Sequence, residues 1–150
     1  MSVFFSPNRL YCVITPTKQP GDLSPHQLER DPLTAKVIGC AIEVRRILGP
    51  GLLESVYEEC LTWELKQAGL RVKRQAPQPI FCKDATLDCG FRMDLVVEDK
   101  LIIELKAVEK PVPIHEAQLL TYLRLSGMSK GLLLNFNTSV LRDGIRRFVM

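Results

Sequence analysis

The sequence predicts an α/β domain of the α+β type, in which a mixed central β-sheet is flanked by helices. Two helical segments come first, strand-like segments follow, and a third helical segment precedes a buried strand, an order typical of such a sheet. The chain has 150 residues, of which 46% are hydrophobic and 25% charged, so we expect one domain with its own core. No run approaches the roughly 18 consecutive apolar residues of a membrane helix, so no membrane span is expected.

The predicted helices are recognised by apolar spacing and by the residues that end them. They cover residues 32–48, 52–68 and 114–125. Asp31-Pro32 supplies an N-cap and a first-turn proline for the first helix, and Gly49-Pro50-Gly51 terminates it. Gly69 is placed to end the second helix, and Ser126-Gly127 to end the third.

The predicted strands are short apolar or alternating runs. They cover residues 70–74, 79–83, 87–97, 101–108 and 131–136. Pro111 and Pro113 break the chain after the run at 101–108. The last segment, residues 140–150, fits either a short helix or an edge strand.

The chain divides by composition near residue 32. Residues 1–32 contain five of the ten prolines and one of the nine glycines, and their charges cancel. We therefore predict a loosely ordered proline-rich arm at 1–32 and one folded domain at 33–150. The net charge of +3 is too small to identify a nucleic-acid-binding protein by itself.

Cysteine and histidine usage favours a cytoplasmic protein with reduced thiols. The five cysteines are odd in number and include no C-x-x-C pair, and residues 1–10 do not resemble a secretory signal. The two histidines are too few and too far apart for a zinc cluster.

Two charged side chains interrupt the most apolar of the strands. Glu104 and Lys106 are two residues apart, so they project from the same face, while the apolar odd-numbered residues take the other. Burying a carboxylate and an ammonium group is costly unless they are paired or bound to something. This strand is therefore the first candidate for a functional site.

Asp94 lies on the preceding strand, and residues 98–100 can form a three-residue hairpin loop. With that loop, Asp94 lies opposite Glu104 on the same face, whereas a two-residue loop would put them out of phase. Two carboxylates this close repel each other unless a cation lies between them. Because all the donors are oxygens, with the carbonyl of Leu105 as a further one, Mg²⁺ or Mn²⁺ is the expected ion.

Each of these side chains also has a simpler interpretation. The charged residues of the hairpin fit an ordinary ion-paired surface. Glu54 fits a first-turn acid that interacts favourably with the helix dipole. Gln118 and Tyr122, which are four residues apart and share a helix face, fit a helix surface with a half-buried tyrosine.

Six segments in order carry a more specific pattern. They are GLLESVY at 51–57, DCGFRMDL at 88–95, IELKA at 103–107, HEAQLLTY at 115–122, GLLLNF at 131–136 and DGIRRF at 143–148. In this order and spacing they resemble the GxxExxY proteins, a bacterial branch of the PD-(D/E)XK nuclease superfamily. The resemblance covers residues 33–149 and implies a restriction-endonuclease-like core. One departure is Arg45, where the pattern has a histidine.

The resemblance implies a metal site. Asp94 looks like the acidic residue of the central hairpin, and Glu104 and Lys106 resemble the (D/E)-x-K motif. Glu54 resembles the helix carboxylate that completes the metal site in many members. Asp94, Glu104, Glu54 and the carbonyl of Leu105 would then hold Mg²⁺ or Mn²⁺, and Lys106, with a pKa depressed by the cation, would assist the attacking water.

The implied function is metal-dependent hydrolysis of phosphodiester bonds in nucleic acid, with DNA favoured and a homodimer compatible with cutting both strands. Gln118 and Tyr122 resemble the Q-x-x-x-Y helix motif and would contact the phosphate or position Lys106. Backbone contacts are expected from Lys66, Arg71, Lys73, Arg74, Arg142, Arg146 and Arg147. Two alternatives stay open: a catalytically inactive nuclease-fold module for nucleic-acid binding or assembly, and a cytoplasmic interaction protein whose charged strand is only structural.

Overall fold

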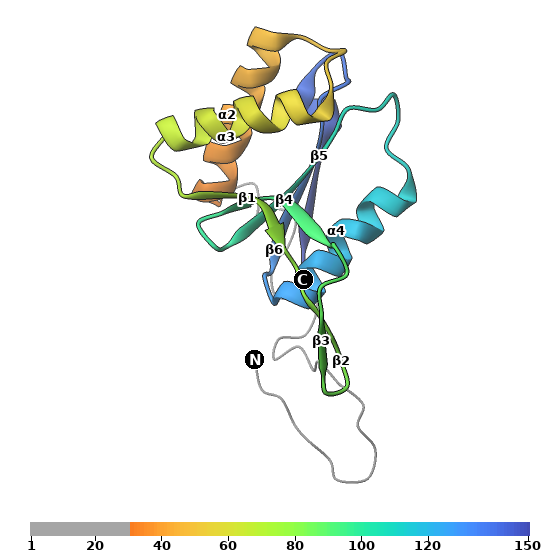
Figure 1. Cartoon of the computed structure of the whole chain (residues 1–150). Coiled ribbons are helices and arrows are strands. Elements are labelled where there is room, and N and C mark those ends of the chain that lie inside the picture. The colour runs from red at the N-terminus through yellow and green to blue at the C-terminus, as the bar shows by residue number, and fades with distance from the viewer. Residues whose placement is uncertain (1–30) are drawn as a thin grey trace.

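A five-stranded mixed β-sheet forms the centre of the molecule (Figure 1). The computed structural model describes residues 31–150, so the predicted arm at 1–32 lies outside the described residues up to residue 30. Along the chain the elements are α2 (Pro32–Leu48), α3 (Glu54–Gln67), β1 (Val72–Pro77), β2 (Ile80–Cys82), β3 (Ala85–Leu87), β4 (Arg92–Val97), β5 (Leu101–Lys106), α4 (Pro113–Ser126), β6 (Lys130–Asn135), the 3-10 helix η1 (Leu141–Gly144) and β7 (Ile145–Val149). The strand order is β1-β4-β5-β6-β7, in which β5 and β6 are parallel and the other neighbours antiparallel. The predicted α+β class is confirmed.

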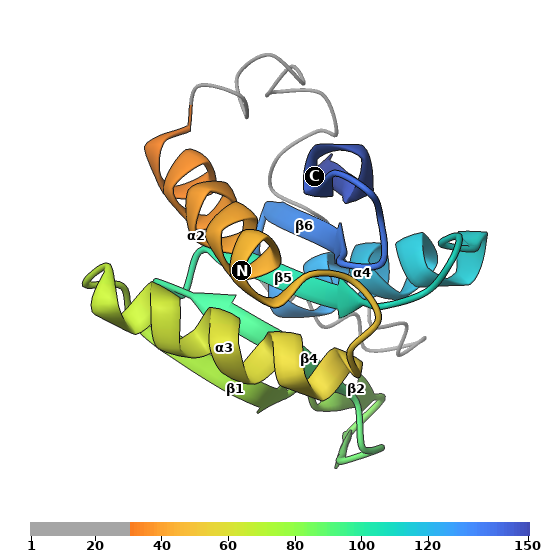
Figure 2. The same ribbon diagram turned by 90° about the horizontal axis from the view of Figure 1, so that it is seen from above.

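Helices cover both faces of this sheet (Figure 2). On one face α2 and α3 share a core with alternate residues of the central strands, including Ile103. On the other face α4 packs through Leu119 against Ile102. Because side chains alternate along a strand, Glu104 and Lys106 project from the α4 side of β5. Within residues 31–150, no helix is long and apolar enough to cross a membrane.

The central strands pack tightly against α4 because the second residue of β6 is a glycine. A Cβ added at Gly131 would lie 3.0 Å from the Cδ1 atom of Leu119, so this glycine lets α4 approach the sheet closely. β5, which lies between β4 and β6, is buried on both faces. This burial explains why its sequence is an almost continuous apolar run.

α2 begins as the sequence predicts, with Asp31 as its N-cap. The Oδ2 atom of Asp31 accepts hydrogen bonds from the backbone N–H of Thr34 at 2.9 Å and from its hydroxyl at 2.7 Å. The Oδ1 atom lies 2.6 Å from Nζ of Lys130 at the start of β6. Asp31 therefore ties the start of the helix to the sheet as well as capping it.

Replacing Asp31 with alanine is expected to lower the free energy of unfolding by about 1–2 kcal/mol, because the N-cap and the ion pair are both lost. Urea denaturation measures the change. Asp31→Asn keeps a capping oxygen and removes the charge, so it should cost less. Equal losses in the two variants would show that the ion pair, not the cap, holds this end of α2.

The prediction of a single strand at 87–97 is wrong, because the segment contains the end of β3 and the whole of β4. Gly90 has φ 73°, in the region that favours glycine, and its N–H donates to Oδ1 of Asp88 at 3.1 Å. This turn separates the two strands. β3 pairs with β2 in a small second sheet that projects from the domain (Figure 1).

Other boundaries shift by a few residues. The strand predicted at 70–74 is found at 72–77, because the N–H of Leu70 donates to the carbonyl of Leu65 and closes the end of α3. The helix predicted from residue 52 begins at Glu54, after an extended Leu53. The ambiguous segment 140–150 contains both a short 3-10 helix and an edge strand.

Candidate active site

The β4–β5 hairpin has the three-residue loop on which the predicted site depends. Val97 pairs with Leu101 across residues 98–100, and the register continues to Leu95 opposite Ile103, which confirms the predicted pairing for these residues. The ladder ends there, so the predicted backbone pair of Asp94 with Glu104 is not part of it. The next contact between the two strands uses a side chain: the Oδ2 atom of Asp94 accepts a hydrogen bond from the backbone N–H of Leu105 at 2.8 Å. The hairpin therefore holds the Asp94 carboxylate against the backbone of β5, beside Glu104.

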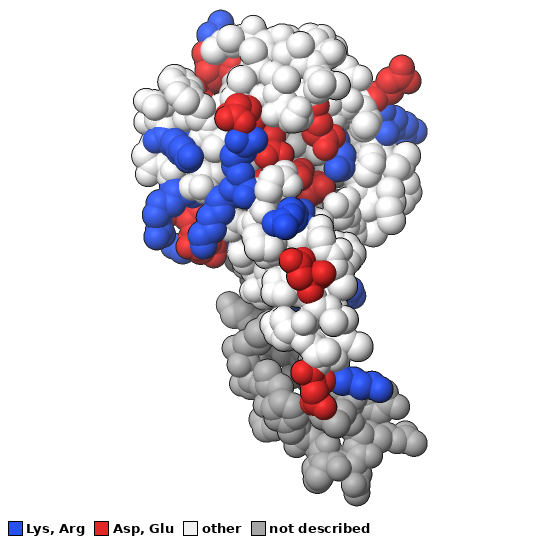
Figure 3. Space-filling view, in the orientation of Figure 1, with Lys and Arg blue, Asp and Glu red and all other residues white. Residues whose placement is uncertain are grey.

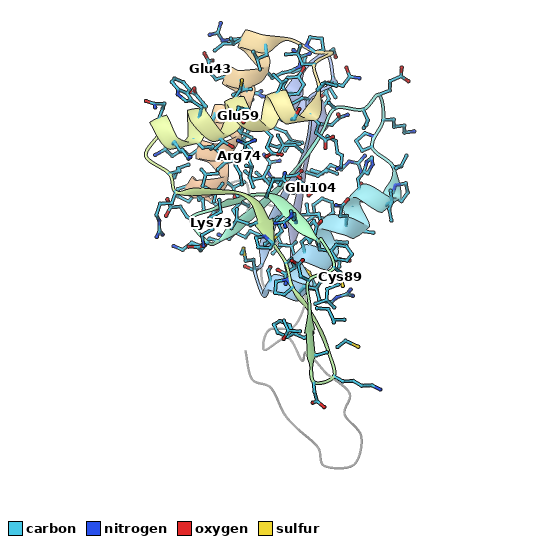
Figure 4. All side chains as sticks on the ribbon, viewed as in Figure 1. Glu43, Glu59, Lys73, Arg74, Cys89 and Glu104 are labelled. Atoms are coloured by element: carbon cyan, nitrogen blue, oxygen red, sulfur yellow. The ribbon has the colours of Figure 1, made fainter. Side chains whose placement is uncertain are left out.

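Glu104, Lys106 and Glu54 meet at the same end of β5. The Nζ atom of Lys106 lies 3.0 Å from Oε1 of Glu104 and 3.8 Å from Oε1 of Glu54, in the first turn of α3. The Glu104 side chain is only 1% exposed, whereas that of Glu54 is 43% exposed. In Figure 4, Glu104 lies between α3 and α4. The structure thus brings together Glu54, Asp94, Glu104 and Lys106, four of the six predicted side chains.

The buried carboxyl group of Glu104 and the partly buried one of Asp94 hold their protons more tightly than usual. Burial, and next the charge of Asp94, raises the pKa of Glu104 from its ordinary 4.5 to about 7. Burial also raises the pKa of Asp94 from 3.8 to about 6, against the lowering effect of the hydrogen bond from Leu105. Two carboxyl groups whose pKa values approach neutrality are typical of a functional site.

The pKa of Lys106 is raised, and the depression expected beside a bound cation stays a prediction. Burial alone would lower the pKa of the ammonium group, but the adjacent Glu104 carboxylate, and then Glu54 and Asp94, raise it overall. The groups that face Lys106 are carboxylates, so the charged form of the lysine is favoured.

The chemistry of the donor atoms fits a hard divalent cation. Oε2 of Glu104 is buried and has no hydrogen-bond partner in the part of the chain that the structure describes. A buried carboxylate oxygen without a partner is costly, and a metal ion would satisfy it. Glu54 and Asp94 add further oxygen donors of the kind that Mg²⁺ prefers. Across residues 31–150 no three acidic, histidine or cysteine side chains are grouped as a ready metal cluster, and the ammonium group of Lys106 lies between Glu104 and Glu54.

The remaining two predicted residues form a unit of their own on α4. Nε2 of Gln118 donates to the hydroxyl oxygen of Tyr122 at 3.0 Å. Tyr122 is 2% exposed, belongs to the core on the α4 side and meets the ring of Phe91 edge-on. Among residues 31–150 no hydrogen bond joins either side chain to Lys106, so a direct positioning contact is not seen.

Glu58 is an acidic residue of this region that sequence reasoning missed. It lies one turn after Glu54 on α3, and its charge contributes to the raised pKa of Asp94. Its carboxylate accepts hydrogen bonds from Nε of Arg74 at 3.1 Å and from Nε2 of Gln75 at 2.8 Å. The spacing of four from Glu54, which puts both on one helix face, was the available signal.

Most basic residues near β1 are engaged in ion pairs. The pairs are Arg71–Glu98, Lys73–Asp99, Arg74–Glu58 and Arg74–Glu59. Figure 3 shows acidic side chains where α3 borders the sheet, with basic side chains beside them. Arg146 is also paired, with Glu116 of α4. Of the predicted contacts to a nucleic-acid backbone, Lys66, Arg142 and Arg147 have no ion pair in the described part of the chain.

Arg45, the departure from the motif pattern, has a structural role. Its Nε atom donates to the carbonyl of Phe136 at 2.9 Å, and its Nη2 atom donates to the carbonyl of Thr138. Arg45 thereby fastens the end of α2 to the segment after β6. Its position leaves the carboxylates of the candidate site unaffected.

Comparison with known proteins gives one positive result. A family model described as the PD-(D/E)XK nuclease superfamily matches residues 31–148, which is nearly all of the described chain. No curated protein and no solved structure gave a significant match. Assignment to the GxxExxY branch stays a prediction. Because the match spans well over half of its length, the chain belongs to the PD-(D/E)XK nuclease superfamily.

Proposed function

We propose that this protein is a metal-dependent nuclease that hydrolyses phosphodiester bonds of nucleic acid. The observation that carries the proposal is that Lys106 contacts both Glu104 and Glu54, while Oε2 of Glu104 is buried and lacks a hydrogen-bond partner within residues 31–150. Asp94 is held on the neighbouring strand by the N–H of Leu105. Membership of a nuclease superfamily supports a nucleic-acid substrate. Mg²⁺ or Mn²⁺ is the proposed cofactor, and DNA the favoured substrate.

Asp94 and Glu104 would hold the ion, with Glu54 and the carbonyl of Leu105 as further oxygen donors. Such an ion, when bound, polarises a phosphoryl oxygen and lowers the pKa of coordinated water. Asp94 is kept in place by the N–H of Leu105, and Glu104 by burial. These supports let both carboxylates present oxygen atoms without reorganising.

Lys106 would act on the attacking water and on the phosphate. Its side chain is 13% exposed and is held by Glu104, so it offers a fixed positive charge at the edge of a buried site. A fixed donor orients a water molecule or stabilises the charge that develops on the phosphate. Gln118 and Tyr122, which are hydrogen-bonded to each other on α4, would contact the substrate phosphate.

An inactive nucleic-acid-binding or assembly module is the second candidate. The observation that favours it is the engagement of Lys106 by two carboxylates, in a region where the described residues form no ready metal cluster. Such a module would bind nucleic acid without cutting it. Cleavage assays therefore separate the two candidates.

The test is cleavage of end-labelled DNA and RNA, each single- and double-stranded, with Mg²⁺, Mn²⁺ or excess EDTA. We expect cleavage with either ion and complete loss of it with EDTA, restored by added Mg²⁺. Glu104→Ala and Lys106→Ala should abolish cleavage and leave the circular dichroism spectrum intact. Lys110→Ala, a change at an exposed lysine four residues away, is the matched control.

Equal cleavage by the wild type and both site variants would overturn the proposal. Binding without cleavage under all metal conditions would favour the inactive module. Light scattering on the same samples tests the proposed homodimer, because a dimer has twice the mass of the 17.0 kDa chain.

A further inference from the structure

The first turn of α3 lacks a side-chain cap that would fix the position of Glu54. Leu53 is the N-cap residue, and its side chain accepts no hydrogen bond. The Glu54 side chain is half-exposed and makes no hydrogen bond within residues 31–150; its approach to Lys106 is 3.8 Å. Neither a cap nor burial therefore determines where this carboxylate lies.

The buried hydroxyl of Tyr57 is hydrogen-bonded to the turn that precedes Glu54. It donates a hydrogen bond to the carbonyl of Gly49 at 2.6 Å and accepts one from the N–H of Leu52 at 3.3 Å. Tyr57 is fully buried, so loss of its hydroxyl would leave these backbone groups without their partner. The turn that leads into α3 is thus tied to the first turn of the same helix.

The ring of Tyr57 reaches towards Lys106 through Phe136. The two rings are stacked with their centroids 4.6 Å apart and their planes 16° apart. The N–H of Phe136 donates to the carbonyl of Lys106 at 2.8 Å. Tyr57 therefore contacts the turn before Glu54 and also contacts Phe136, which is hydrogen-bonded to the backbone of Lys106.

We infer that Tyr57 is a positioning residue that holds the carboxylate of Glu54 against Lys106 and the proposed metal site. The inference rests on the proposed function, because it assigns Glu54 to that site. It also gives the tyrosine of the G-x-x-E-x-x-Y segment a structural purpose. Without the hydrogen bonds of Tyr57 to Gly49 and Leu52, the half-exposed Glu54 side chain would sample positions away from Lys106.

The experiment is a double-mutant cycle read out by Mn²⁺ binding, measured by electron paramagnetic resonance without any substrate. Tyr57→Phe keeps the ring stack and removes the hydroxyl. It should weaken Mn²⁺ binding by about 10-fold, the usual effect of losing a group that orients a metal ligand. In a Glu54→Gln background the same change should have no further effect, because Tyr57 acts through Glu54.

Two further variants guard against a trivial loss of stability. Leu65→Val removes a methylene group from a buried residue at the other end of α3, so it should lower the melting temperature and leave Mn²⁺ affinity unchanged. Phe136→Leu weakens the ring stack and leaves the hydroxyl in place. It should weaken Mn²⁺ binding only when Glu54 is present.

The outcomes separate this inference from the proposed function. Additive effects of Tyr57→Phe and Glu54→Gln, or equal weakening by Leu65→Val, would overturn the inference while Mn²⁺ binding by the wild type upholds the metal site. Absence of Mn²⁺ binding by the wild type would overturn both. Non-additive effects with an unchanged Leu65→Val control would support both.

Discussion

Glu104→Gln is expected to abolish cleavage and, at the same time, to stabilise the metal-free protein at pH 8. Cleavage should fall by about three orders of magnitude, because a neutral amide is a much weaker ligand than a carboxylate for the Mg²⁺ ion that Glu104 is proposed to hold. Stability should rise because a fully buried carboxylate beside Asp94 is costly in its charged form. A change that removes function and adds stability is typical of a functional residue.

The free energy of unfolding is expected to increase as the pH falls from 8. The pKa values of Glu104 and Asp94 are raised in the folded protein to about 7 and about 6. As the pH falls from 8, the folded state takes up protons before the unfolded chain does, so the free energy of unfolding increases until the unfolded pKa values near 4 are passed. Glu104→Gln should remove about half of this increase, because the shift of Asp94 remains, and the free energy of unfolding of the variant should exceed that of the wild type at pH 8 by about 2 kcal/mol.

Urea denaturation at pH 8 and pH 5, with and without Mg²⁺, measures these effects. Mg²⁺ should stabilise the wild type and leave Glu104→Gln unchanged, because a ligand stabilises only the state that binds it. Glu109→Gln makes the same chemical change at an exposed position and should alter neither property. A Glu104→Gln protein that is less stable than the wild type at pH 8 would contradict the account.

Gly144→Ala is expected to cost about 3 kcal/mol of folding free energy, a large effect for a single methyl group. An added Cβ would meet the carbonyl oxygen of Asn135 well inside van der Waals contact and would lie 3.1 Å from Cγ2 of Thr138. The Asn135 backbone cannot move aside easily. It lies on buried strand β6, and its side chain is bonded in both directions to the backbone of Val108, at 3.0 and 2.8 Å.

Two other glycines serve as matched controls for the same substitution. Gly39→Ala is in an exposed position on α2 with no atom within 4 Å of the added Cβ, so it should raise stability by about 0.5–1 kcal/mol. The added Cβ of Gly131→Ala would lie nearest to side-chain atoms of Leu119, at 3.0–3.2 Å, and not to backbone, so the stability of this variant should fall between the two. Thermal and urea denaturation rank the three variants, and a Gly144→Ala protein as stable as the wild type would contradict the packing argument.

The parts of the fold that sequence could predict are those set by local chemistry. Asp31 and Gly49 delimit α2 because capping and chain reversal depend on a few neighbouring residues. The register of the β4–β5 hairpin, from Val97–Leu101 to Leu95–Ile103, followed from a three-residue loop. These features need no knowledge of distant parts of the chain.

The parts that sequence could not predict depend on contacts between distant segments. Glu58 pairs with Arg74 and Gln75 because β1 lies beside α3 in the fold. Arg71 pairs with Glu98 because the β4–β5 turn lies beside the start of β1. Neither pairing can be predicted from the local spacing of apolar residues. The turn in which Asp88 accepts a hydrogen bond from Gly90 could not be predicted from that spacing either.

The placement of Lys106 beside Glu104 has a consequence for the folding pathway. The β4–β5 hairpin joins neighbouring segments and can close early, whereas Glu54 and β6 reach it only through long connections. Closure brings two negative charges together while the surrounding helices are still undocked. Because Lys106 belongs to the same hairpin, its positive charge can offset that repulsion before distant segments have packed against the hairpin.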